Sequence, residues 1–347
     1  MTEAGAAPLT VAVTGPTGDI GRALLRALDA SPRIERVVGM ARRPFDPSQM
    51  GLGPKVRYRR GDITDPDAVE SLAAEANVVV HLAFLIFGSK EETSRINLEG
   101  SRNVFLAALN AGCERLVYTS SVAAYGFHDD NPKMLGEDVP VRGSSDHYYS
   151  EQKASVERLL EDLSEGSSTD VYVFRPCIVA GPSALALIEK IPYVQLSEKL
   201  PDGVRSVVGK LPGLRPVIPD PGVPFQLVHE DDVASALVAA VEGEGEPGAY
   251  NLAAEGRVGL DDLAHALGWY CVPVPELALD ATIKIASRLP YLPSGVAWIN
   301  AVQVPVLVDT TKARTKLDWE PRYDALETLA QTVQGAREAG LLRRRSR

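Results

Sequence analysis

Tyr149 and Lys153 have the side-chain types and the spacing that proton transfer requires. They are four residues apart in SDHYYSEQKASVERLL, so on a helix both side chains emerge from one face. An ammonium group near a phenol favours the phenolate and lowers the phenol's pKa from its reference value of about 10. A tyrosine that exchanges protons is the device that a carbonyl reduction needs. The alternative interpretation is a solvated helix face with Tyr149 half-buried.

The hydroxyl of Ser121 could complete this arrangement. Residues 115–121, RLVYTSS, predict a strand that ends at Ser121. A doubly wound sheet presents side chains at such strand ends to its ligand, and the hydroxyl could hydrogen-bond a substrate oxygen beside Tyr149. The alternative is that Ser121 caps a helix or a turn.

A glycine-rich turn near the start of the chain suits a nucleotide. Residues 9–25, LTVAVTGPTGDIGRALL, predict a strand, a tight turn and a helix that begins near Asp19. Gly15, Gly18 and Gly21 recur where a side chain would block a ligand's approach or the packing of the helix on the strand. Free N–H groups and the positive end of the helix dipole suit a pyrophosphate. An ordinary glycine-rich loop is the alternative.

The elements that must position these residues alternate along the first half of the chain. Further strands are predicted at residues 36–40, 56–59, 78–83, 115–121 and 171–175, and helices at 66–76, 94–111 and 149–163. Apolar strands that alternate with helices indicate an α/β fold with a doubly wound parallel (Rossmann) sheet. Its ligand should lie beyond the carboxyl ends of the strands.

Beyond residue 182 many prolines interrupt the pattern, which predicts an irregular, smaller cap. Residues 225–228 lead into a helix at 231–242 and a strand at 249–252, and further helices are expected at 260–267, 276–288 and 324–341. We therefore expect a dinucleotide-binding domain at residues 1–182, to which 225–252 return. A substrate-binding cap would comprise 183–224 and 253–341, followed by a basic tail at 342–347.

Composition narrows the class of protein. The 347 residues are 45% apolar and carry a net charge of -10 without long charged blocks, which supports a full core and argues against a nucleic-acid partner. Cys113, Cys177 and Cys271 lack the spacing of a disulfide framework or a metal site. The longest apolar run, 78–87, is too short to span a bilayer. We expect a cytoplasmic protein with no metal and no membrane partner.

Taken in order, these motifs resemble the extended short-chain dehydrogenase/reductase family, also called the NAD-dependent epimerase/dehydratase family. Its nucleotide motif, Thr-Gly-x-x-Gly-x-x-Gly, stands complete as TGPTGDIG at 14–21. SSVAAYG at 120–126 aligns Ser121 with the catalytic serine, and Tyr149 and Lys153 match the catalytic pair. Further matches are Asp62 in GDITD, HLA at 81–83, Asn97 and Gly100 in NLEGS, VHEDDVA at 228–234 and DTTKARTKLDW at 309–319. The segment RPCIVAGP at 175–182 is similar to the family's nicotinamide-side loop.

The resemblance implies hydride transfer between a nicotinamide C4 and a carbonyl or carbinol carbon. In it Tyr149 exchanges the proton, Lys153 lowers the pKa of Tyr149 and holds the nicotinamide ribose, and Ser121 orients the substrate oxygen. Asn97 is a further candidate catalytic residue. The candidate cofactor-binding residues are Gly15, Thr17, Gly18, Asp19, Ile20, Gly21, Arg42, Asp62, Ile63, Leu82, Ala83, Tyr149, Lys153 and Ile178.

One departure from the family pattern concerns the cofactor. NAD-preferring members usually carry an acidic residue at the end of the second strand, whereas residues 40–43 here read Met-Ala-Arg-Arg. The guanidinium of Arg42 suits a 2'-phosphate, so NADP is favoured over NAD. Ordinary surface charge at Arg42 and Arg43 is the alternative.

Other departures concern the substrate. Val122 and Ala123 stand where dehydratases of the family place acidic residues, which argues against dehydration. Ile178 and Phe225 stand nearest to an asparagine and an arginine that serve nucleotide diphosphates in other members. We therefore expect an oxidoreductase with a small carbonyl or alcohol substrate. A sugar or sugar-nucleotide epimerase with tightly bound NAD and a nucleotide-sensing binding protein are the alternatives. The resemblance also implies a homodimer.

Overall fold

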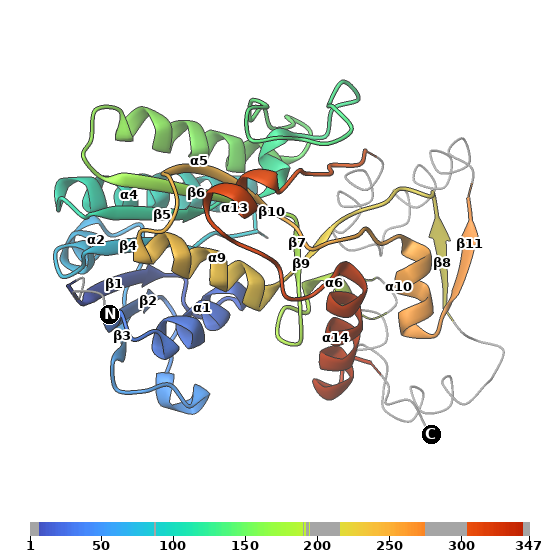
Figure 1. The fold of residues 1–347 in the computed structure, drawn as a ribbon, viewed down its shortest axis with the longest axis horizontal. Helices are drawn as coiled ribbons and strands as arrows, with labels where there is room; N and C mark the ends of the chain where they lie inside the picture. Colours follow the sequence, from blue (N-terminus) through green and yellow to red (C-terminus); the bar gives the residue numbers. More distant parts are fainter. Residues whose placement is uncertain are drawn as a thin grey trace.

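A parallel sheet of seven strands forms the centre of the molecule (Figure 1). The computed structural model describes residues 7–86, 88–189, 191, 194, 216–274 and 304–342. The strands are β1 (Leu9–Thr14), β2 (Ile34–Ala41), β3 (Val56–Arg60), β4 (Val78–His81), β5 (Arg115–Thr119), β6 (Asp170–Pro176) and β10 (Gly248–Leu252). Their order in the sheet is β10-β6-β5-β4-β1-β2-β3. This order reverses direction at β1, which is the arrangement of a doubly wound fold.

Helices cover both faces of this sheet (Figure 1). The helices α1 (Asp19–Ala30) and α9 (Glu230–Glu242) lie on one face, and α2 (Pro66–Ala73), α4 (Gly100–Asn110) and α5 (Tyr148–Ser164) lie on the other. Val11 and Val13 of β1 point into the first core, whereas Ala12 between them points into the second. The predicted α/β Rossmann sheet is confirmed.

Some element ends differ from the sequence prediction. The helix expected at 94–111 begins earlier, because the Ser89 hydroxyl accepts the N–H of Glu92 at 3.1 Å and caps α3 (Lys90–Ser94). A π-helical turn, η2 (Arg95–Glu99), then leads into α4. The strand expected at 78–83 ends at His81, the last residue of β4. The strand expected at 115–121 ends at Thr119, the last residue of β5.

A second group of elements lies beside the sheet, on the right in Figure 1. The strands β8 (Val217–Asp220) and β11 (Tyr270–Pro273) form a small parallel sheet that packs with α10 (Leu260–Leu267), while α14 (Ala325–Glu338) packs with α6 (Ala186–Glu189) and α10. The strands β7 (Ile178–Ala180) and β9 (Leu227–His229) pair between the two groups. The helix expected at 276–288 and the tail from 343 onward lie outside the described residues. The division into domains stays a prediction.

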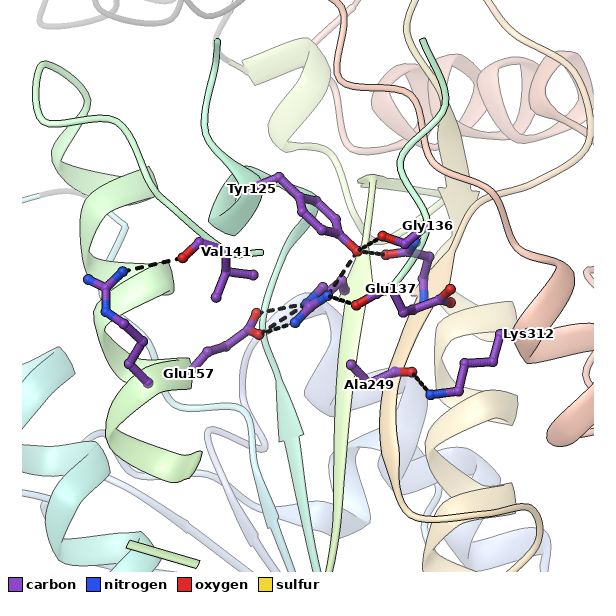
Figure 2. Close-up of polar contacts among 10 residues, drawn as sticks. Tyr125, Gly136, Glu137, Val141, Glu157, Ala249 and Lys312 are labelled. Atoms are coloured by element: carbon purple, nitrogen blue, oxygen red, sulfur yellow. Dashed lines mark hydrogen bonds and ion pairs between the residues drawn. The ribbon is translucent and has the colours of Figure 1, made fainter. Parts of the chain in front are cut away.

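The edge strand β10 is closed by side chains rather than by another strand. The backbone N–H of Asn251 donates to the carboxylate of Glu137 at 2.8 Å, and the Asn251 amide donates to the carbonyl of Leu135 at 3.0 Å. Lys312, on α13 (Thr311–Lys316), donates to the carbonyl of Ala249 at 2.8 Å (Figure 2). These contacts attach the segment at 135–137 and the helix α13 to the edge of the sheet. None of the helices in the described ranges is long and apolar enough to cross a membrane.

Candidate active site

The glycine turn follows β1 and leads directly into α1. Gly15 has a φ of +75°, and a Cβ on it would lie 2.7 Å from the backbone nitrogen of Ala83. A Cβ on Gly21 would overlap the carbonyl oxygen of Gly15. Both glycines are therefore required by the protein's own packing, because the turn passes close to the segment after β4 and close to α1.

Gly18 differs from these two glycines. Its φ of -76° suits any residue, and a Cβ on it would meet nothing closer than the Gly15 oxygen at 3.6 Å. Gly18 is also the N-cap of α1 and supplies no side-chain acceptor, so the first-turn N–H groups of Asp19 and Ile20 remain available. Thr17 lies in the same turn, where its carbonyl accepts from the guanidinium of Arg22. An open, uncapped helix N-terminus fits the pyrophosphate of a dinucleotide.

The other predicted nucleotide residues gather at the ends of neighbouring strands. Arg42 directly follows β2 and is exposed. Asp62 follows β3, and its carboxylate accepts the N–H and the hydroxyl of Thr64 at 3.0 Å each. Ile63 is buried against α4, where a Cβ on Gly100 would lie 2.6 Å from its terminal carbon. Leu82 and Ala83 directly follow β4 and are partly exposed.

Lys153 is the buried member of the candidate proton-transfer pair, which consists of Tyr149 and Lys153. Its Nζ donates to the carbonyl of Thr119 at 2.9 Å and lies 3.4 Å from the hydroxyl of Tyr118. Only 3% of the side chain's surface is exposed, and burial lowers the pKa of Lys153 to about 7 while the charge of Glu157 opposes the decrease. The ammonium is thus buried one helical turn along α5 from Tyr149.

Tyr149 is partly buried at the start of α5. Burial raises its pKa above the ordinary value, and a hydrogen bond with Ser121 opposes this rise. The direction differs from the lowered pKa that the sequence led us to expect from Lys153. The reason is that burial removes the solvation of the phenolate, and this is the largest cause of the shift.

Ser121 does not end the strand as expected. It lies beyond β5, where its hydroxyl accepts the N–H of Ala123 at 3.2 Å and caps the short 3-10 helix η3 (Val122–Tyr125). The same hydroxyl forms a hydrogen bond with the side chain of Tyr149. The capping interpretation of Ser121 is therefore confirmed, whereas its hydrogen bond to a substrate oxygen stays a prediction.

Asn97 lies in the π-helical turn η2 and is buried. Its Oδ1 accepts the N–H of Leu85 at 2.7 Å, while its Nδ2 donates to the Leu85 carbonyl at 2.9 Å and to Gln152 at 2.8 Å. Gln152 in turn donates to Thr93 at 3.0 Å. Asn97 thus fastens the segment after β4 to α5. The structure therefore gives Asn97 a structural role at this junction, and the catalytic role expected from the sequence stays a prediction.

Arg175 was expected to belong to a nicotinamide-side loop at 175–182, but its side chain is buried within the domain. The guanidinium forms an ion pair with Glu157 of α5 at 2.6 Å and donates to the Tyr125 hydroxyl at 2.9 Å (Figure 2). Ile178 is 38% exposed and begins β7. Arg175 therefore holds α5, which carries the proton-transfer pair, against β6. An arginine within an apolar strand was the available sign, because a buried cation requires a partner.

Phe84 is a residue of the site that sequence reasoning missed. Its ring lies edge-to-face with Tyr149 at a centroid distance of 5.6 Å. The Nζ of Lys153 lies 3.8 Å from the centre of the same ring. An aromatic residue in an apolar run predicts core packing, so nothing in the sequence distinguished Phe84 from its neighbours.

Comparisons with known proteins place this geometry in context. The fold is similar to that of UDP-glucose 4-epimerase from Thermotoga maritima with UDP-glucose, with a TM-score of 0.71 and 20% identity over 95% of this chain and 99% of that chain. The sequence is 24% identical to protein y4nG of Sinorhizobium fredii, over 93% of this chain and 77% of that protein. It is 28% identical to 2-alkyl-3-oxoalkanoate reductase of Shewanella oneidensis, over 52% of this chain and 47% of that protein.

The family model that matches this chain covers the residues of the candidate site. It runs from β1, which leads into the glycine turn, through Ser121 and the Tyr149 and Lys153 pair to the end of β10. Residues 11–253 match the NAD dependent epimerase/dehydratase family, and the chain belongs to this family.

Proposed function

We propose that the protein is an NAD(P)-dependent oxidoreductase that transfers hydride between nicotinamide C4 and a carbonyl or alcohol carbon. The observation that carries this proposal is the arrangement of Ser121, Tyr149 and Lys153. The phenol is bonded to the serine hydroxyl, and the buried ammonium lies one helical turn away. These groups follow β5 and begin α5, two strands away from the glycine turn after β1. A nicotinamide dinucleotide that starts at the turn would end beside them.

The residues present fit such a cofactor. The uncapped N-terminus of α1 and the open space at Gly18 suit the pyrophosphate, and Lys153 suits the hydroxyls of the nicotinamide ribose. When bound, the nicotinamide ring supplies the hydride in reduction and accepts it in oxidation. Tyr149 then gives its hydroxyl proton to the substrate oxygen as a carbonyl becomes an alcohol, and takes it back in the reverse direction. Ser121 orients that oxygen.

Three features support a carbonyl or alcohol substrate over a nucleotide sugar. Val122 and Ala123 beside Ser121 offer no acid for the elimination of water. Ile178 and Phe225 offer no hydrogen bond to a diphosphate. The Shewanella oneidensis protein that matches about half of this chain is named 2-alkyl-3-oxoalkanoate reductase, and 2-alkyl-3-oxoalkanoates are ketones. The homodimer and the cytoplasmic location expected from the sequence stay predictions.

NADP is the cofactor that the charges favour. Arg42 and Arg43 follow β2 and are exposed, and Arg60 at the end of the neighbouring β3 is exposed as well. The Nε of Arg60 donates to the carbonyl of Arg42 at 3.1 Å, which holds these guanidinium-bearing residues together. A 2'-phosphate on the adenine ribose would find cations here and no acidic side chain at positions 40–43.

The test begins with the nucleotide content of the purified protein. The protein is denatured, any released nicotinamide nucleotide is identified, and the emptied protein is titrated with NADPH and NADH. An empty site that prefers NADPH, followed by NADPH oxidation with a ketone or aldehyde, is the expected result. Stoichiometric NAD that does not exchange would instead identify an epimerase. Binding of neither nucleotide would overturn the assignment as an enzyme.

A further inference from the structure

Phe84 contacts both members of the proton-transfer pair. It lies in the segment after β4, whereas Tyr149 and Lys153 both come from α5. The Nζ of Lys153 is 3.8 Å from the ring centre of Phe84, and the ring of Tyr149 meets that of Phe84 at an interplanar angle of 87°. This distance lies well within the range of a cation–π interaction, which is strongest where water is excluded.

In the described structure, the groups that contact the Lys153 ammonium directly are neutral. In the part of the chain that the structure describes, no carboxylate forms an ion pair with its ammonium. Glu157, the acid one turn along α5, is engaged by Arg175 at 2.6 Å. Tyr118 of β5 contributes a hydroxyl at 3.4 Å and a ring at 5.1 Å. His81 of β4 is uncharged at neutral pH, because burial and the charge of Lys153 lower its pKa to about 3.

The segment that carries Phe84 is held in place on its carboxyl-terminal side. Asn97 binds both backbone groups of Leu85, the residue that follows Phe84. The hydroxyl of Tyr148 donates to the carbonyl of Ile86 at 2.6 Å. Because Tyr148 directly precedes Tyr149 on α5, this hydrogen bond ties the segment to the helix that carries the pair. The contact between the Phe84 ring and Lys153 is therefore fixed by hydrogen bonds of the neighbouring residues.

We propose that Phe84 is a positioning residue that keeps the Lys153 ammonium charged and next to Tyr149, with its ring over the cation and against the phenol. The ring does the work that a carboxylate would do elsewhere, without forming an ion pair that would withdraw the ammonium from Tyr149 or from a bound ribose. The use of this charge in proton transfer rests on the proposed function. The charge itself is measured without substrate or nucleotide.

The experiment follows the protonation of Lys153 by NMR. The full chain is labelled with ¹³C and ¹⁵N lysine, and the Lys153 signal is identified by its loss in Lys153→Met. Phe84→Leu keeps an apolar side chain but removes the ring, and we expect it to lower the pKa of Lys153 by about one, which is a tenfold decrease in the ratio of ammonium to amine at fixed pH. Phe84→Tyr keeps the ring and should leave that pKa within about 0.3 of the wild type.

Phe127→Leu is the matched control. Phe127 packs on His147 at a centroid distance of 5.1 Å, so its loss removes an aromatic ring of the same neighbourhood without touching Lys153. An unchanged pKa of Lys153 in Phe84→Leu, or an equal decrease in Phe127→Leu, would overturn the proposal.

Fluorinated phenylalanine at position 84 keeps the test valid if Phe84→Leu does not fold. Successive fluorine atoms preserve the shape of the ring while they weaken the negative face that attracts a cation. We expect the pKa of Lys153 to fall with each substitution, and a constant value across the series would contradict the proposal. Because the readout needs no turnover, a failure of the proposed reaction would leave this result intact and distinguishable.

Discussion

The glycine turn and the proton-transfer pair both lie at the carboxyl ends of strands of one sheet, but they are built in different ways. The turn is made of backbone, and Gly15 and Gly21 are needed because the chain approaches itself too closely for a side chain. The pair is made of side chains, and Lys153 is held by β5, α5 and the Phe84 segment. The nucleotide site thus depends on local conformation, whereas the chemical site depends on contacts between distant parts of the chain.

This difference predicts that nucleotide binding and chemistry can be separated by mutation. Tyr149→Phe removes only the hydroxyl, and we expect turnover of an identified substrate to fall by roughly 10²- to 10⁴-fold. Nucleotide affinity should be unchanged, because the turn is untouched. Steady-state kinetics together with a nucleotide titration measure both effects. Full turnover in Tyr149→Phe would show that the proton comes from another group.

The turn itself separates glycines that serve packing from a glycine that serves the ligand. A Cβ at Gly21 would overlap the Gly15 carbonyl, so Gly21→Ala should lower the free energy of unfolding by roughly 2–4 kcal/mol. Gly18→Ala should change it by only about 0.5 kcal/mol but weaken nucleotide binding about tenfold, because the methyl group would enter the pyrophosphate site. Denaturant unfolding and nucleotide titration of the two variants decide this. Equal stability losses would remove the distinction.

The pair, unlike the turn, should make stability depend on pH. Burial lowers the pKa of Lys153 from 10.5 to about 7, so between these values the unfolded chain binds more protons than the folded one. Stability therefore rises with pH across this window, and the burial penalty is full and constant below it. Relative to Lys153→Met, the wild type should gain roughly 1–3 kcal/mol from pH 7 to pH 10. Parallel stability profiles for the two proteins would show that Lys153 titrates normally.

A third region, at the ends of β2 and β3, should set the preference for NADPH over NADH. It should do so without affecting the glycine turn or the pair of Tyr149 and Lys153. Arg42→Ala removes a cation that lies beyond the turn, and we expect the preference for NADPH over NADH to fall about tenfold. Arg36→Ala, which removes an arginine of β2 that pairs with Glu75 beyond the end of α2, is the control and should leave the preference unchanged. An unaltered ratio in Arg42→Ala would mean that its charge is incidental.

The same contrast explains how much could be predicted from the sequence. The turn and the strands of the sheet were predictable, because glycine spacing and continuous apolar runs report on local conformation and burial. Helix ends were less so: Ser89 caps α3 from outside the expected helix. The spacing of Tyr149 and Lys153 was visible along one helix, but their pKa values were not, because these depend on burial by β5 and by Phe84.

Contacts across the sequence were beyond reach for the same reason. Asn97 was singled out by its motif, yet the motif cannot show that its amide holds Leu85 and Gln152. Arg175 was placed in a nicotinamide-side loop because its motif resembles one, and this motif cannot show that the side chain pairs with Glu157, which lies outside it. A single sequence names the residue in each case and leaves its partner undetermined.

The contact between Glu137 and Asn251 at the edge strand β10 also bears on solubility. An open edge of a sheet offers unpaired backbone groups to another molecule and invites aggregation. At β10 the carboxylate of Glu137 occupies the N–H of Asn251 and adds a negative charge. At the opposite edge β3 bears Arg57, Arg59 and Arg60. An acidic side chain at one edge and basic side chains at the other thus oppose the pairing of either edge strand with a strand of another molecule.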